Sequence, residues 1–114
     1  MNLGVFSVLF QELPFTAMLE KVQGMGLDCV EIGTGGYPGN HHCDLDGLLA
    51  ARERIPDYRR QIESAGLFIS ALSCQGNPLH PNSEIANAHR CIFEKTVLLA
   101  ERLEVPVQIG RAHV

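Results

Sequence analysis

The fold is decided by the stretch MGLDCVEIGTGGYPGN, residues 25–40, in which a helix ends, a strand follows at once and a glycine-rich segment comes next. Gly26 is the residue type that readily adopts the left-handed conformation closing a helix. Residues 27–32 then form a short strand pattern. The stretch therefore predicts a helix-to-strand junction followed by a loop from Gly33 to about Cys43.

The same junction recurs about every 40 residues along the chain. Gly66 precedes a strand over residues 67–73, and Glu104 precedes a strand that opens at residues 105–107. Residues 3–10 form a near-continuous apolar run, which is typical of a first strand in a parallel sheet. This repeat predicts an α/β fold with a parallel sheet, either a (β/α)8 barrel or an open doubly wound sheet.

Helical patterns fill the segments between these strands. Pro14 suits the first turn of a helix that ends near Gly26. Asp44 or Asp46 is placed to cap a short helix, and Pro56 marks either the first turn of the helix after it or the break between the two. A longer apolar stripe predicts a helix over residues 83–103.

Composition places the chain among globular proteins and disfavours several partners. It has 114 residues, 46% hydrophobic residues and a net charge of −4, with basic residues scattered along it. Neither nucleic acid nor a membrane is therefore an expected partner, because polyanion binding needs a basic patch and no apolar run approaches the ~20 residues that span a bilayer. The start of the chain lacks a signal-peptide pattern, and the four cysteines show no C-x-x-C spacing. We expect a reduced, cytoplasmic protein.

The most informative candidates follow the second strand, because α/β proteins bind ligands beyond the carboxyl ends of their strands. Glu31 ends an otherwise apolar strand and needs a partner, either a metal, a hydroxyl-rich substrate or a structural salt bridge. Gly35 either permits a tight turn or lets the backbone approach a small polar ligand. A dinucleotide fingerprint is disfavoured, because Pro38 stands where its third glycine belongs.

A second group of candidates follows the third strand. His80 is flanked by prolines that stiffen its loop, so it is either a held imidazole or an exposed loop histidine. Asn77 either binds hydroxyls or forms a turn ahead of Pro78. The trio HHC at residues 41–43 is a poor metal site, since zinc ligands are usually separated by two or more residues.

Residues 26–40 and 70–81 resemble the sugar phosphate isomerase/epimerase family, the xylose isomerase-like TIM barrels that also include the endonuclease IV fold. The resemblance covers essentially residues 3–107. It implies a barrel of which this chain holds only about three and a half βα units. It also implies a divalent metal (Mn, Mg or Zn) bound by later strands, and proton transfer beside a carbonyl through an enediolate. No catalytic or metal-binding residue is then expected within this chain.

The resemblance also suggests roles for individual residues. Glu31 matches the family's frequent strand-two acid, which implies a substrate contact. Gln75 stands where the family often has a histidine, and an amide side chain cannot shuttle protons, so we expect at most a substrate contact there. His80 remains a candidate substrate contact.

The end of the chain has a different signature. Residues 109–114, IGRAHV, are what ATC GGA AGA GCA CAC GTC encodes, and this is the start of a widely used short-read sequencing adapter. The next adapter triplet is a stop codon. We expect residues 1–107 to be a partial barrel and residues 108–114 to be a non-native tail.

Taken together, these features predict the N-terminal fragment of a metal-dependent sugar or sugar-phosphate isomerase/epimerase, inactive by itself, with a small-molecule sugar substrate. One alternative is an endonuclease IV-like phosphodiesterase, which is expected to show a basic DNA face and a metal-binding histidine near Gln75. Another is a non-enzymatic small-molecule binding module on an open α/β sheet. The oligomeric state stays open.

Overall fold

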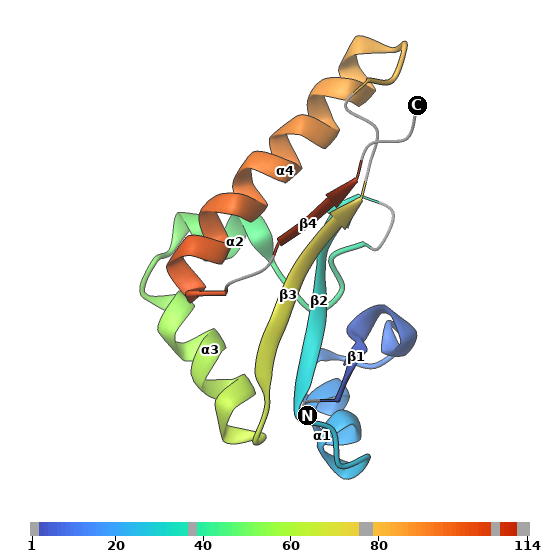
Figure 1. Cartoon of the computed structure of the whole chain (residues 1–114). Helices are drawn as coiled ribbons and strands as arrows, with labels where there is room; N and C mark the ends of the chain where they lie inside the picture. Colours follow the sequence, from blue (N-terminus) through green and yellow to red (C-terminus); the bar gives the residue numbers. More distant parts are fainter. Residues whose placement is uncertain (1–2, 37–38, 76–78, 106–107, 112–114) are drawn as a thin grey trace.

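A computed structural model of the chain describes residues 3–36, 39–75, 79–105 and 108–111 (Figure 1). Strands and helices alternate along it, which confirms the predicted α/β class. In chain order the elements are β1 (Gly4–Phe6), the 3-10 helix η1 (Ser7–Phe10), α1 (Phe15–Gly24), β2 (Cys29–Gly36), α2 (Leu45–Ala50), α3 (Arg54–Ser64), β3 (Phe68–Gln75), α4 (Ser83–Leu103) and β4 (Gln108–Arg111).

The four strands form one sheet in the order β1-β2-β3-β4, so neighbours in the sequence are neighbours in space. All three pairs are parallel, as the junction repeat predicts. In the register of β2 and β3, Glu31 lies opposite Ala71 and Gly33 lies opposite Ser73. The strands β1 and β4 form the two edges of the described sheet.

The apolar stripes of the helices pack against one face of this sheet. Figure 1 shows α2, α3 and α4 along the same side of the strands. The rings of Phe15 in α1 and Tyr58 in α3 stack at 4.9 Å, which joins α1 to the same layer. One core cluster takes buried residues from all four helices, including Met18, Val22, Leu48, Ile62 and Leu99, and from the two central strands, including Val30, Ile32 and Leu72.

The junctions that end the helices have the predicted backbone conformation. Gly26 and Gly66 both have φ of +74°, which is the left-handed region. At the third junction Glu104 adopts the same region with φ of 58°. A side chain in this conformation is strained, because its Cβ approaches the following carbonyl oxygen.

Side chains cap the starts of α2 and α4, and the cap of α2 was predicted. Asp44, and not Asp46, caps α2 by accepting a hydrogen bond from Gly47 N at 3.1 Å. Asn82 caps α4 by accepting from Glu84 N at 2.9 Å. Pro56 falls in the first turn of α3, as expected for a residue without an N–H donor.

The first strand is shorter than the apolar run predicted. Only Gly4–Phe6 is a strand, and residues 7–10 turn into η1, where Leu9 is 71% exposed. The edge strand finds partners only along Cys29, Val30 and Glu31. An apolar run by itself does not distinguish a buried strand from a short helix, and here the tertiary pairing decided.

The second and third strands are longer than predicted. The segment expected to begin a loop at Gly33 continues β2 to Gly36, with a register shift between Gly33 and Gly35. The third strand reaches Gln75 instead of ending at residue 73. Each strand extends because the other supplies backbone partners, which outweigh the low strand propensity of the glycines.

The fourth strand lies at Gln108–Arg111, later than the predicted start at residues 105–107, of which residues 106 and 107 fall outside the described residues. It includes residues assigned to the non-native tail. Its pairing with β3 uses backbone atoms that any sequence supplies, so the origin of the tail stays a prediction. No helix in the described parts of the chain has the length and apolarity to cross a membrane.

Candidate functional site

The face of the sheet opposite the helices, here called the inner face, carries Glu31 of β2 and Ser73 of β3. The intervening residues Ile32 and Leu72 are opposite each other and belong to the core under the helices. Because side chains alternate along a strand, Glu31 and Ser73 project to the other side. They are diagonal neighbours on adjacent strands, with Glu31 third among the 8 residues of β2 and Ser73 sixth among the 8 residues of β3. The prediction that Glu31 ends its strand is therefore wrong, because pairing with β3 continues β2 to Gly36.

Glu31 is a half-buried carboxyl group whose environment favours its neutral form. Desolvation by burial raises the pKa of Glu31 above its ordinary value of 4.5, and the nearby Ser73 hydroxyl partly opposes the rise. None of the ion pairs formed by the described residues includes Glu31. The structural salt bridge considered for this residue therefore finds no partner among them.

Ser73 is fully buried, with 0% of its surface exposed. Its Oγ lies close enough to the Glu31 carboxylate to favour the charged form, yet the geometry is not that of a formed hydrogen bond, because Oγ has no partner at hydrogen-bonding distance and angle. A buried hydroxyl without a partner is uncommon in folded proteins. Ser73 was not among the predicted site residues. It lies two residues after Ala71, which is opposite Glu31, so the strand period places it on the same face of the sheet as Glu31.

Gly35 is explained by packing. It is buried with φ of +153°, and a Cβ at this position would lie 2.8 Å from Cγ2 of Ile92 in α4. Any side chain would therefore require the Ile92 side chain or the backbone to shift. The predicted contact between Gly35 and a ligand stays a prediction.

The candidates after β3 fall partly outside the described residues. His80 lies in the turn before α4, where its Nδ1 accepts a hydrogen bond from Asn82 N at 3.0 Å. This contact orients the imidazole against the helix start. Asn77 and the side chain of Gln75 are outside the described residues, and the backbone of Gln75 ends β3 opposite Gly36.

The trio at residues 41–43 has structural partners. His42 Nε2 donates to the Leu13 carbonyl at 2.8 Å, since a carbonyl oxygen only accepts. Tyr58 donates its hydroxyl to the His42 carbonyl at 2.7 Å. Burial raises the pKa of the Cys43 thiol to about 12, so it stays protonated at neutral pH. These contacts tie the loop after β2 to the segment before α1 and to α3.

A narrow crevice lies beside this loop at the carboxyl ends of β1 and β2. Its lining includes Ser7, Gln11, Gly33 and His41. Among the described residues, no three His, Cys, Asp or Glu side chains are grouped to hold a metal ion. The polar lining places hydrogen-bonding groups beside Gly33, two residues after Glu31 on β2.

A hydroxyl pair not anticipated from the sequence joins the end of β2 to α4. Thr34 Oγ1 lies 2.7 Å from Thr96 Oγ1, and both residues are buried. Thr96 Oγ1 is also 2.8 Å from the Ile92 carbonyl, and Thr34 Oγ1 is 3.3 Å from the Ser73 carbonyl. The two hydroxyl groups have only two hydrogens for these three contacts. The two shorter distances favour donation from Thr34 Oγ1 to Thr96 Oγ1 and from Thr96 Oγ1 to the Ile92 carbonyl. The pair anchors the strand end next to Ser73.

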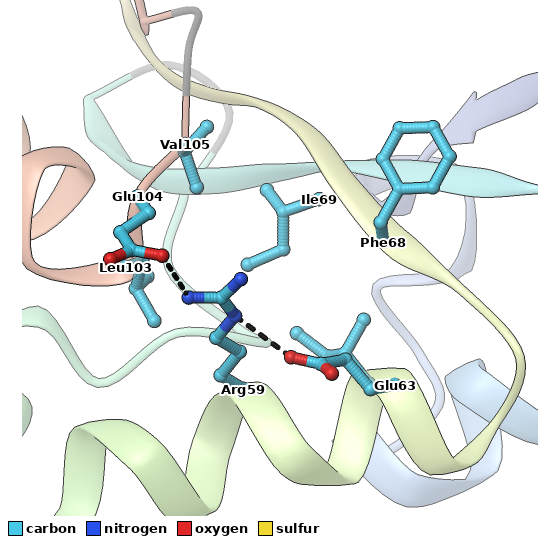
Figure 2. A pocket seen from close by; sticks show the side chains of 8 residues that line it. Arg59, Glu63, Phe68, Ile69, Leu103, Glu104 and Val105 are labelled. Carbon is cyan, nitrogen blue, oxygen red and sulfur yellow. Dashed lines mark hydrogen bonds and ion pairs between the residues drawn. The ribbon is translucent and has the colours of Figure 1, made fainter.

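A larger cavity, of about 300 Å³, lies at the amino end of β3, away from Ser73. Figure 2 shows Arg59 of α3 reaching between Glu104 and Glu63, with nitrogen-to-oxygen distances of 2.9 and 2.8 Å. The apolar side of the cavity includes Phe68 and Ile69. Because both carboxylates already pair with Arg59, this cluster joins α3 to the end of α4.

The fold and the inner face define an α/β protein with a parallel sheet and a half-buried carboxylate on the face opposite its helices. No family model matches the chain. The chain is similar to the Bacillus subtilis protein YfiH, described as an uncharacterized protein, with 36% identity over 105 residues. That alignment covers 92% of this chain and 33% of YfiH. The chain thus spans about a third of the length of this curated relative.

Proposed function

We propose that this chain is the N-terminal part of a (β/α)8 barrel, and that the full-length protein is a metal-dependent sugar or sugar-phosphate isomerase/epimerase. The observation that carries the proposal is the half-buried Glu31 on the helix-free face, without an ion-pair partner among the described residues. On its own the chain is expected to be inactive, because it supplies only a substrate contact.

The strand order supports the barrel. A doubly wound sheet reverses its strand order at a switch point and carries helices on both faces. Here the four strands follow one another in sequence, and the helices pack on one face. That arrangement is expected of consecutive βα units in a barrel, whose interior would be the inner face. The length of YfiH, of which this chain covers 33%, leaves room for the remaining strands.

The chemistry of the inner face supports a hydroxyl-rich ligand. An ionised Glu31 accepts hydrogen bonds from sugar hydroxyl groups, and its partial burial strengthens them because the local dielectric is low. The chain's net charge of −4 favours a small substrate over nucleic acid as the partner. Three buried thiols and an exposed one at Cys91 accord with a reduced, cytoplasmic protein.

The proposed divalent metal does not find its ligands here. Mn²⁺, Mg²⁺ or Zn²⁺ needs several carboxylate or imidazole donors in one place, and the described residues offer no such group. In our proposal those ligands come from later strands of the full-length protein. No step of the reaction is therefore assigned to a metal on this chain.

The test begins with the source locus. We expect its reading frame to continue past residue 107 into further βα units whose strands end in Glu, Asp and His. The encoded protein is then incubated in D2O with a panel of ketoses, aldoses and their phosphates with Mn²⁺, Mg²⁺ or Zn²⁺, and exchange of the proton beside the carbonyl is followed by NMR. A native frame that stops after Val114, or one that adds a single strand, would contradict the barrel.

A matched pair of variants links any activity to the inner face. We expect Glu31→Gln to lower kcat/KM about 10-fold or more, as loss of a charged hydrogen bond to substrate does. Glu20→Gln, on the exposed side of α1, serves as the control and should leave kcat/KM unchanged. Equal activity of the wild-type protein and the Glu31→Gln variant would remove Glu31 from the substrate site.

A further inference from the structure

The buried hydroxyl of Ser73 has no structural bond to account for it. Its Oγ is enclosed and forms no hydrogen bond of good geometry. A hydroxyl in this situation usually lowers stability, since desolvation of the polar group is not compensated. Its placement beside Glu31 therefore calls for a role other than holding the sheet together.

The register of the sheet leaves Glu31 as the polar neighbour of Ser73 on the inner face. Directly across from Ser73 on β2 is Gly33, which has no side chain to contact the hydroxyl. The residues opposite Glu31 are Phe6 of β1 and Ala71 of β3, and neither carries a charge or a hydrogen-bonding side chain. Ser73 is the diagonal neighbour of Glu31 on β3, and its hydroxyl is the side-chain group that acts on the carboxylate.

We propose that Ser73 is a positioning residue for Glu31: its enclosed hydroxyl, which has no other partner, is the donor available to the ionised carboxylate on the inner face, and that carboxylate accepts a second hydrogen bond from a ligand. The proposal rests on the proposed function for the identity of that ligand, a sugar or sugar phosphate. Ser73 itself does not contact the substrate, because its hydroxyl is enclosed beneath the surface. The Thr34 and Thr96 hydroxyls hold the strand end next to it.

The energetic consequence separates this role from a structural one. Ser73→Ala removes a hydroxyl that forms no hydrogen bond, so at a pH below the Glu31 pKa, where this carboxyl is protonated, the fold should keep or gain stability. The same change removes the group that opposes the effect of burial on Glu31, so the pKa of Glu31 should rise. A serine that merely supported the sheet would show the opposite pair of results, lower stability with the Glu31 pKa unchanged.

The experiment is an NMR titration of the glutamate carboxyl carbons in the ¹³C-labelled chain, with the Glu31 signal assigned by its loss in Glu31→Gln. We expect the Glu31 midpoint to move to higher pH in Ser73→Ala and to return toward the wild-type value in Ser73→Thr, which restores the hydroxyl. Ser64→Ala, at the exposed end of α3, is the matched control and should leave the midpoint in place. Urea unfolding of each variant reports stability.

An unchanged or lower Glu31 midpoint in Ser73→Ala would overturn the proposal, as would a clear loss of stability without a shift. Failure of Ser73→Ala to fold would also overturn the proposal, because the hydroxyl would then be needed for the structure. This measurement needs no activity. In an active full-length enzyme, Ser73→Ala should also move the acidic limb of the kcat/KM pH profile upward, so failure of the proposed function and failure of the Ser73 proposal are distinguishable.

Discussion

Glu104 occupies the position at which the two equivalent helix-to-strand junctions have glycine. Replacing Glu104 tests whether its left-handed backbone conformation lowers the free energy of unfolding. The left-handed conformation costs a side chain about 1–2 kcal/mol relative to a right-handed one, and glycine avoids that cost. The carboxylate of Glu104 compensates in part through its 2.9 Å ion pair with Arg59. Since the two side chains are 75% and 43% exposed, that pair contributes less than about 1 kcal/mol.

Two variants separate these contributions. Glu104→Ala loses the ion pair and keeps the strain, so we expect it to be less stable than wild type by up to about 0.5–1 kcal/mol. Glu104→Gly loses the pair and also releases the strain, so it should be more stable than Glu104→Ala by about 1 kcal/mol. Gly66→Ala introduces the same strain and should lower the free energy of unfolding by about 1 kcal/mol, because φ is +74° at this position. No atom lies within 4 Å of an added Cβ there, so a steric clash does not contribute.

The assay is urea unfolding followed by far-UV circular dichroism, in the 114-residue chain or in the longer protein if the chain associates. It is repeated in 0.5 M NaCl, where the difference between wild type and Glu104→Ala should shrink because salt screens an exposed pair. The difference between Glu104→Gly and Glu104→Ala should persist. Equal stability of these two variants at both salt concentrations would refute the strain at Glu104.

Three further results are expected. The folded chain raises the pKa of Glu31 above 4.5, so it binds this proton more tightly than the unfolded chain does. Stability should therefore fall as pH rises from 4.5 to the raised pKa. Glu31→Gln should remove this fall from the profile of unfolding free energy against pH. Iodoacetamide at pH 8 should label exposed Cys91 before Cys43, whose pKa is about 12, and mass spectrometry that finds Cys43 labelled first in the folded chain would contradict the burial. Tyr58→Phe should destabilise the chain by about 1–3 kcal/mol in urea unfolding, because the His42 carbonyl loses its 2.7 Å donor, and a neutral result would mean that water replaces it.

Local features of the chain were predictable because they depend on a few adjacent residues. The glycines at positions 26 and 66 close helices through backbone freedom alone, and Asp44 caps α2 through a bond to a residue three positions away. The helix over residues 83–103 matches its prediction at both ends. Glu31 was singled out from sequence as a carboxylate at the end of an apolar strand, but β2 continues past it to Gly36, so only its place on an otherwise apolar strand was predictable.

The extents of the strands were not predictable, because backbone pairing with a neighbour decides where a strand ends. Residues 33–36 have the composition of a loop and still extend β2, since β3 offers hydrogen-bonding partners through Gln75. Residues 7–10 have the composition of a strand and turn into a 3-10 helix at the edge of the sheet.

The sequence by itself determined the α/β class, the parallel repeat and the carboxylate at Glu31, since hydrophobic periodicity and turn residues act over short distances along the chain. Only the tertiary structure decided that Ser73 lies beside Glu31, that Ile92 requires a glycine at Gly35, and that His42 binds the Leu13 carbonyl. These contacts join residues 29 to 57 positions apart. Strand register and helix packing set such distances, and the local pattern of residues does not encode them.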